Sequence, residues 1–233
     1  MNDTARNDAV NTTELIRLGI LAMPVAGALK LLGNLGTFNS IGYGIPQASE
    51  AATVTGAGFF AGELVGSIFP VLLTPFWVFA LFAYLTPTAG RLALIAGMVC
   101  CLLGTGITLP ALGVINYAIP ALGHAYQSGQ PDVMAIADSF FTWPRGAMLY
   151  PAVLFPIGTI LFTIAAWRGA VLPRVAVLLC AVSGVLIAIP IPLHSVRLAG
   201  GAIGLAAGAW IAFAVRRRFQ TLVTAPAVSG WCG

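Results

Sequence analysis

Six long apolar runs dominate this sequence, and each is long enough to cross a lipid bilayer as an α-helix. A helix needs about 20 predominantly apolar residues to span the hydrocarbon. Because lipid offers backbone N–H and C=O groups no hydrogen-bond partners, helices are the form that such runs can adopt there. The sequence therefore predicts an all-α membrane protein, a six-transmembrane-helix bundle. Its predicted spans are residues 15–36, 57–84, 92–118, 146–167, 172–192 and 197–215.

Composition excludes a water-soluble domain. The chain is 59% hydrophobic and 8% charged, whereas a soluble domain carries roughly 25% charged residues. The basic residues, which give a net charge of +4, are scattered between the apolar runs, so we expect no nucleic-acid partner. The lipid bilayer is the expected partner. The runs at 57–84 and 92–118 exceed the length needed, so these helices should tilt, kink or project beyond the hydrocarbon.

The basic residues also predict an orientation, because short cytoplasmic loops of membrane proteins are enriched in arginine and lysine. Two arginines, Arg145 and Arg197, lie on the side opposite the termini. We therefore expect a multi-pass plasma-membrane protein with a cytoplasmic segment 1–14, a transmembrane domain 15–218 and a flexible cytoplasmic tail 219–233. The eight basic residues on the side of the termini are Arg6, Arg17, Arg91, Arg168, Arg174, Arg216, Arg217 and Arg218.

Lys30 and Glu63 are the two ionisable side chains deep within the apolar runs. Such groups cost several kcal/mol in hydrocarbon and usually face the interior of a bundle. Counting 1.5 Å per residue places both at a similar depth, roughly 9 Å below the outer surface. An ion pair between them is available if the first two spans pack together. Such a pair would at least fix the register of these helices.

The functional interpretation is that Lys30 and Glu63, at their shared depth, line a modest polar cavity that opens to the outside. Glu63 is then the candidate catalytic acid as well as a candidate ligand contact. Depth alone does not tell which way a side chain faces. The residues predicted to bind a ligand are Lys30, Asn34, Glu63, Thr108, Tyr150 and His194, and Arg197 follows His194 in the same turn.

Two helices carry glycine at every fourth position. These stripes are Gly58, Gly62 and Gly66 in the second span and Gly200, Gly204 and Gly208 in the sixth. Small residues at this spacing let helices approach closely in lipid. We expect both stripes to pack inside the bundle, and the alternative is a homo-oligomer formed through them.

Known catalytic signatures do not occur in the chain. It has no phosphate-binding glycine loop, no HExxH and no GxSxG, so we expect no cofactor and no metal. The leading hypothesis is a membrane protein with an outward-facing cavity for a small or lipophilic ligand. One alternative is an enzyme of isoprenoid or lipid metabolism, similar to a terpene cyclase, in which protonated Glu63 starts the reaction. Another is a proton-coupled transporter in which Glu63 changes protonation.

The region from Leu161 onward carries a resemblance. Its residues are the Trp167-Arg168-Gly169 sequence, the Leu172-Pro173-Arg174 turn, and Ala209-Trp210 before the terminal arginines. In these features it resembles the C-terminal half of multi-pass integral membrane proteins of actinobacteria, a family whose domain has no known function. The resemblance covers about a quarter of the chain and implies an architecture, without catalytic residues to carry over.

Overall fold

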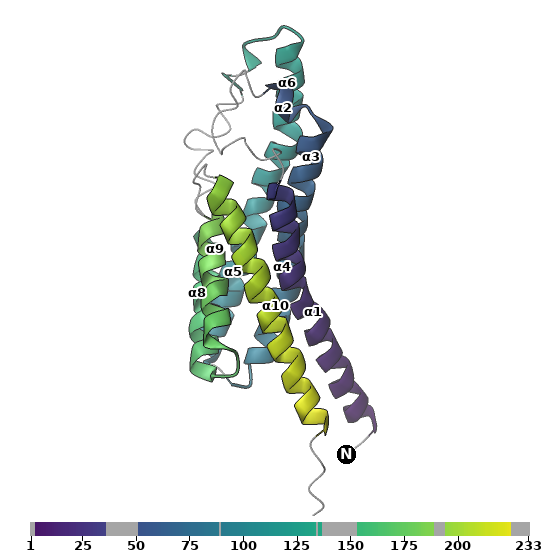
Figure 1. The fold of residues 1–233 in the computed structure, drawn as a ribbon, viewed down its shortest axis with the longest axis vertical. Helices are drawn as coiled ribbons and strands as arrows, with labels where there is room; N and C mark the ends of the chain where they lie inside the picture. Colours follow the sequence, from purple (N-terminus) through teal and green to yellow (C-terminus); the bar gives the residue numbers. More distant parts are fainter. Residues whose placement is uncertain are drawn as a thin grey trace, which may run out of the picture.

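The computed structural model describes residues 3–35, 51–88, 90–133, 135–136, 153–188 and 194–224. Throughout these residues the regular secondary structure is helical (Figure 1), which confirms the predicted all-α class. The helices are α1 (Asp3–Leu35), α2 (Ala51–Val54), α3 (Ala57–Glu63), the π-helix η3 (Leu64–Ile68), α4 (Phe69–Leu85), α5 (Arg91–Gly113), the π-helix η4 (Val114–Ala118), α6 (Ile119–Gln127), α8 (Leu154–Gly169), α9 (Arg174–Ala188) and α10 (His194–Thr224).

Four helical stretches are long and apolar enough to cross a membrane. They are Asn11–Leu35, Ala57–Leu85, Arg91–Gln127 and Ser195–Thr221. The apolar helices α8 and α9 are shorter, with 16 and 15 residues in the described part of the chain. The first part of the predicted span 146–167 precedes α8 and lies outside the described residues, as does the end of the span 172–192.

The helices pack side by side in the order of the chain. Helix α1 contacts α4, α4 contacts α5, α5 contacts α8, α8 contacts α9 and α9 contacts α10; α10 then returns to α1. Figure 1 shows α1 and α10 side by side. This arrangement places the N-terminal and C-terminal helices against each other.

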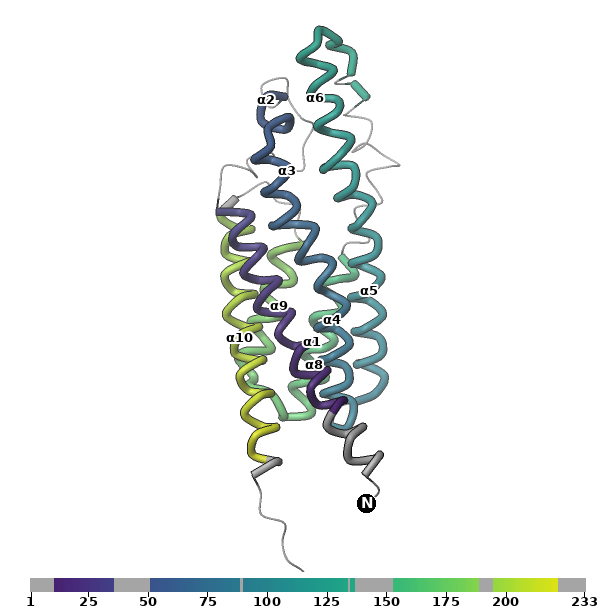
Figure 2. The backbone as a smooth tube through the Cα atoms, turned by 90° about the vertical axis from the view of Figure 1, so that its right-hand side faces the viewer, coloured from purple at the N-terminus to yellow at the C-terminus, as the bar shows by residue number. Residues whose placement is uncertain are grey.

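One end of the molecule collects most of the arginines, and we call it the arginine end. It holds the start of α5, the turn between α8 and α9, and the last turns of α10 (Figures 1 and 2). Helix α10 continues to Thr224, so it extends past the boundary at 218 that the sequence analysis gave to the tail. The arginines of these elements are Arg91, Arg168, Arg174, Arg216, Arg217 and Arg218.

The opposite end carries a projection built from α2, α3 and α6. These helices extend beyond the end of α1 in Figure 2. The predicted third span ended at residue 118, and that boundary was wrong, because residues 119–127 continue the helix as α6. Packing stabilises this segment: a buried cluster joins Val54, Phe59 and Ile119, and Gln127 donates a hydrogen bond to the Thr55 hydroxyl at 3.3 Å.

Two π-helices precede prolines in the two long stretches. Segment η3 ends two residues before Pro70, and η4 ends two residues before Pro120. A proline ring clashes with the carbonyl four residues earlier in a regular α-helix. The wider π turn takes up this clash without ending the helix. Pro70 and Pro120 therefore follow π segments, whereas Pro24, Pro75 and Pro110 lie inside α-helices.

The surface of α1 shows how the molecule meets its surroundings. Leu15, Leu18, Val25 and Leu32 are 69%, 64%, 48% and 59% exposed. A soluble helix would place polar residues on such a face. The interior is also apolar, with Ile20, Leu85, Leu94 and Val215 among its buried side chains near the arginine end. Apolar residues on both the inside and the outside are what a lipid environment requires.

Glycines form the contacts between neighbouring helices. A Cβ atom on Gly208 would lie 2.7 Å from the Pro24 nitrogen of α1, and one on Gly204 would lie 2.6 Å from the Ser183 hydroxyl of α9. Gly66 likewise faces Gly33 of α1, 2.9 Å from its Cα by the same measure. Members of both glycine stripes thus pack inside the molecule, as expected. In lipid the hydrophobic effect does not drive helices together, and close van der Waals contacts of this kind stabilise their packing instead.

Candidate functional site

The backbones of α1 and η3 touch near the projecting end of the molecule. A Cβ atom on Gly33 would overlap the Cα and N of Gly66 and would stand 2.8 Å from the carbonyl oxygen of Gly62. Lys30 lies three residues before Gly33, and Glu63 lies three residues before Gly66. Residues at this spacing share one face of a helix. The glycine contact therefore brings the faces that carry Lys30 and Glu63 together.

Burial is pronounced at this contact. Glu63 is 7% exposed and Asn34 is 1% exposed, and Lys30 is half-buried. The Asn34 Nδ2 donates to the backbone carbonyl of Lys30 at 2.5 Å, one turn earlier in α1. The amide of Asn34 is therefore directed partly toward its own helix.

Two charged groups act on Lys30 here. Lys30 is attracted by the Glu63 carboxylate and repelled by the Arg197 guanidinium. Arg197 comes from α10, four residues before Gly201, whose position packs against Leu31 of α1 at 3.1 Å. It therefore lies on the side of α10 that faces α1. We call Lys30, Glu63 and Arg197 the outer charge cluster.

Lys30 and Glu63 interact without a direct ion pair. Among the described side chains, the ion pair within 4.0 Å joins Arg17 and Glu14, at 2.6 Å, whereas Lys30 feels Glu63 through the longer-range Coulombic attraction. Two of the three groups in the outer charge cluster are cations. Burying charged groups in a medium of low dielectric constant is costly.

Thr108, another predicted ligand residue, is not gathered with this cluster. The Thr108 hydroxyl donates to the Gly104 carbonyl of its own helix at 2.7 Å. Thr108 is one turn beyond Gly104, whose position packs against Phe155 of α8, so it lies on the α8 side of α5. The depth of Thr108 was predicted from the sequence, but Thr108 faces the interface between α5 and α8. Tyr150 and the side chain of His194 lie outside the described residues, although His194 begins α10.

Asn116 is a buried polar residue that the search for ionisable groups missed. It lies in η4 and is 2% exposed. Its Nδ2 donates to the Leu112 carbonyl at 2.8 Å, while its Oδ1 is fully enclosed with no hydrogen-bond partner among the described residues. An enclosed acceptor of this kind costs about 1–3 kcal/mol. The signal in the sequence was an asparagine inside an apolar run.

An aromatic contact relates η4 to α3. The rings of Phe60 and Tyr117 meet edge to face with centroids 6.0 Å apart. Asn116 precedes Tyr117, and Glu63 follows Phe60 by one turn. The Asn116 Oδ1 therefore lies at a similar height along the molecule as the outer charge cluster. Both π-helices also lie at this level, and π segments occur often at functional sites.

The chemistry that these groups support is recognition of charge. Two cations at one level complement a carboxylate or a phosphate. Within the part of the chain that the structure describes, histidine, cysteine and acidic residues do not gather into a group that would hold a metal ion. No protein-family model, curated protein or solved structure matches the chain.

Proposed function

We propose that the chain is a multi-pass plasma-membrane protein that crosses the bilayer six times, with both termini in the cytoplasm. The packing of α8 and α9 in line with the longer apolar helices supports the six-span count. The 16 residues of α8 rise roughly 24 Å at 1.5 Å per residue, and residues 146–152 continue the predicted span. The gathering of arginines at one end supports the orientation.

We infer that the outer charge cluster binds a small amphiphilic ligand with an acidic group. The observation that carries this inference is that Lys30 and Arg197 come close enough to repel each other beside Glu63, each from a different helix, while Lys30 and Glu63 form no direct pair. A carboxylate or phosphate from a ligand would be attracted by the two cations. That attraction is strongest where water is excluded.

The surroundings of the cluster favour an amphiphile over a soluble anion. Leu32, Leu35 and Phe60 are 59%, 63% and 39% exposed on the helices that carry Lys30 and Glu63. In a bilayer these side chains face lipid tails. A ligand could therefore keep its acidic head at the charges while its apolar tail lies against this surface.

Binding of palmitate to the purified protein in nanodiscs tests the proposal, with hexadecanol as the neutral probe of equal chain length. We expect palmitate to bind more tightly than hexadecanol, and Lys30→Gln to weaken palmitate binding about tenfold or more, since a hydrogen bond to a charged group contributes about 1.5–3 kcal/mol. The matched control is Arg91→Gln, which removes one positive charge at the opposite end.

Glu63→Gln separates the proposal from the two alternatives. As a competing anion, Glu63 opposes the ligand, so the substitution should strengthen palmitate binding. An enzyme that uses Glu63 as its acid would lose turnover, and a proton-coupled transporter would lose proton-driven uptake. Equal binding of palmitate and hexadecanol, unchanged by Lys30→Gln, would overturn the proposal.

A further inference from the structure

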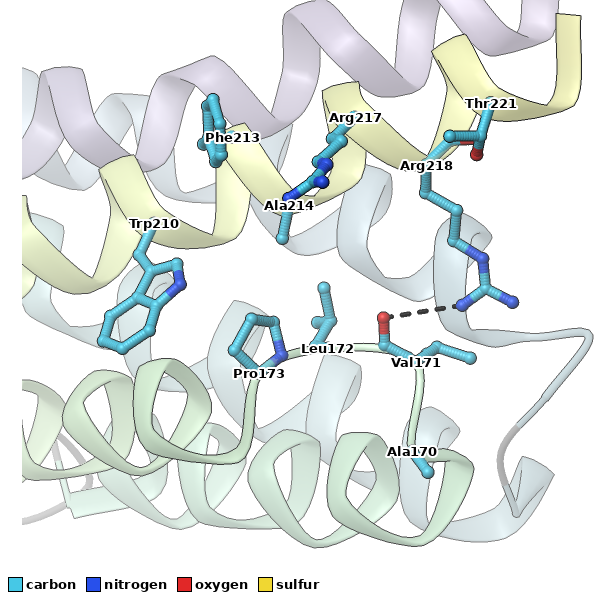
Figure 3. A pocket seen from close by; sticks show the side chains of 10 residues that line it. All are labelled: Ala170, Val171, Leu172, Pro173, Trp210, Phe213, Ala214, Arg217, Arg218 and Thr221. Carbon is cyan, nitrogen blue, oxygen red and sulfur yellow. Dashed lines mark hydrogen bonds between the residues drawn. The ribbon is translucent and has the colours of Figure 1, made fainter. Parts of the chain in front are cut away.

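A groove lies at the arginine end, between α10 and the turn that joins α8 to α9. Its volume is about 540 Å³. Figure 3 shows α10 on one side and the turn on the other, with Arg218 reaching across so that its guanidinium donates to the Val171 carbonyl at 3.4 Å. The α10 residues that line it include Trp210, Phe213, Arg217 and Arg218.

The tight turn explains why the groove stays open. Helix α8 ends at Gly169, and Ala170 then adopts a left-handed conformation with φ 50°. The chain enters α9 at Arg174, so just four residues, 170–173, connect the helices. Leu172 of this turn is buried. The remaining side chains of so short a turn are too few to fill the space beneath α10.

The groove changes from apolar to charged along α10. Trp210 and Phe213 are 45% and 65% exposed, and Arg217 and Arg218 follow one to two turns later, also exposed. From Trp210 to Arg217 the helix rises roughly 10 Å at 1.5 Å per residue. A phospholipid also changes from a charged head group to an apolar acyl chain over a similar length. The polarity of such a lipid therefore matches that of the groove.

The charged side chains of the helices that line the groove, α8, α9 and α10, are all arginines. No aspartate or glutamate occurs from residue 139 to the end of the sequence, while seven arginines do. Arg174, at the start of α9, stacks on the Trp167 ring with its guanidinium carbon 5.2 Å from the centroid. The groove therefore presents a positive field that no acid on α8, α9 or α10 offsets.

We propose that this groove binds an anionic phospholipid of the leaflet next to the arginine end. Arg217 and Arg218 hold the phosphate, and Trp210 and Phe213 lie along the acyl chain. Charge complementarity favours an anionic lipid over a zwitterionic one, because each nearby arginine contributes attraction to an anionic head group. This site lies at the end opposite the outer charge cluster and does not depend on the ligand proposed there.

Native mass spectrometry of the purified full chain in a neutral detergent tests the proposal, with dioleoyl phosphatidylglycerol as the probe and dioleoyl phosphatidylcholine as the comparison. We expect saturable, tighter binding of phosphatidylglycerol. The double variant Arg217→Gln/Arg218→Gln should weaken it roughly 30-fold, which corresponds to about 1 kcal/mol for each arginine. The matched control, Arg91→Gln/Arg216→Gln, removes two charges outside the groove and should change binding less than about threefold by the same reasoning.

Three outcomes overturn the proposal. Equal weakening in the two double variants would mean a diffuse field rather than a groove. Equal binding of the two lipids would remove the role of charge. Displacement of the lipid by inorganic phosphate at millimolar concentration would mean a soluble anion site. Because all four arginines in these variants are exposed, we expect them to fold like the wild type, and thermal melting of each variant verifies this.

Discussion

Replacing Gly33 with alanine should force α1 away from η3. The new Cβ would overlap the Cα and N of Gly66 and would lie 2.8 Å from the carbonyl oxygen of Gly62. These neighbours are backbone atoms, so no change of rotamer relieves the overlap. The helices themselves must separate, and the faces that carry Lys30 and Glu63 separate with them.

The reciprocal variant gives a magnitude. A Cβ on Gly66 would lie 2.9 Å from the Gly33 Cα. Carbon atoms rest at about 3.5–4.0 Å, so it must retreat by about 0.6–1.1 Å (3.5 minus 2.9 and 4.0 minus 2.9). A gap of that size removes roughly a quarter to a half of the dispersion energy of the contacts beside it. We expect Gly66→Ala to lower the free energy of unfolding by about 1–3 kcal/mol and Gly33→Ala by at least as much.

Thermal unfolding monitored with a thiol-reactive fluorogenic dye measures this effect, because Cys101 is fully buried and reacts when the helices separate. The control is Gly113→Ala in α5, where a Cβ would have no neighbour within 4 Å. Alanine is favoured over glycine in a helix by about 1 kcal/mol, so the control should melt at or above the wild-type temperature. If Gly33→Ala also melts at or above that temperature, α1 and η3 do not make the described contact.

Three further predictions concern other parts of the molecule. Ser183→Ala removes the 2.8 Å hydrogen bond from the Ser183 hydroxyl to the Gly200 carbonyl between α9 and α10, and the same melting assay should show a loss of about 0.6 kcal/mol. Gly158→Ala should lower the melting temperature more than Gly106→Ala, since a Cβ on Gly158 would lie 2.6 Å from a backbone nitrogen of α5 whereas one on Gly106 would meet nothing within 4 Å. An alkaline phosphatase reporter fused after Gly129, in the turn that follows α6, should be active, and one fused at the C-terminus should be inactive; the reverse pattern would contradict the proposed orientation.

Hydropathy predicted the bounds of a helix well where the helix is apolar throughout. The predicted span 57–84 agrees with the stretch Ala57–Leu85. It failed at the outer end of the third span, where the helix continues through α6 to Gln127. The residues there are too polar for a span, and packing holds them in the helix. A Cβ on Gly123 would lie 2.7 Å from Val54 Cγ2 of α2, a long-range contact that no local pattern announces.

The candidate site could be predicted in depth but not in direction. Counting residues along antiparallel helices placed Lys30 and Glu63 at one level, and the glycine contact between α1 and η3 brings their faces together. The same count placed Thr108 at that level, yet each residue turns about 100° around a helix axis, so Thr108 faces α8. Asn116 escaped notice because its amide carries no charge, although burying an unpaired amide oxygen is also costly.

Lys30→Gln distinguishes a binding site from a purely structural one. A structural role for Lys30 would require its attraction to Glu63 to outweigh the cost of burial, so the variant would melt at a lower temperature. In a ligand site, the repulsion from Arg197 and the burial of the ammonium group oppose folding until an anion arrives. We therefore expect the ligand-free Lys30→Gln protein to melt at or above the wild-type temperature, while its affinity for palmitate falls about tenfold, the loss of a hydrogen bond to a charged group. Opposite movement of stability and affinity is typical of residues kept for function. A fall in melting temperature as large as that of Gly66→Ala, with palmitate affinity unchanged, would assign Lys30 to the fold alone.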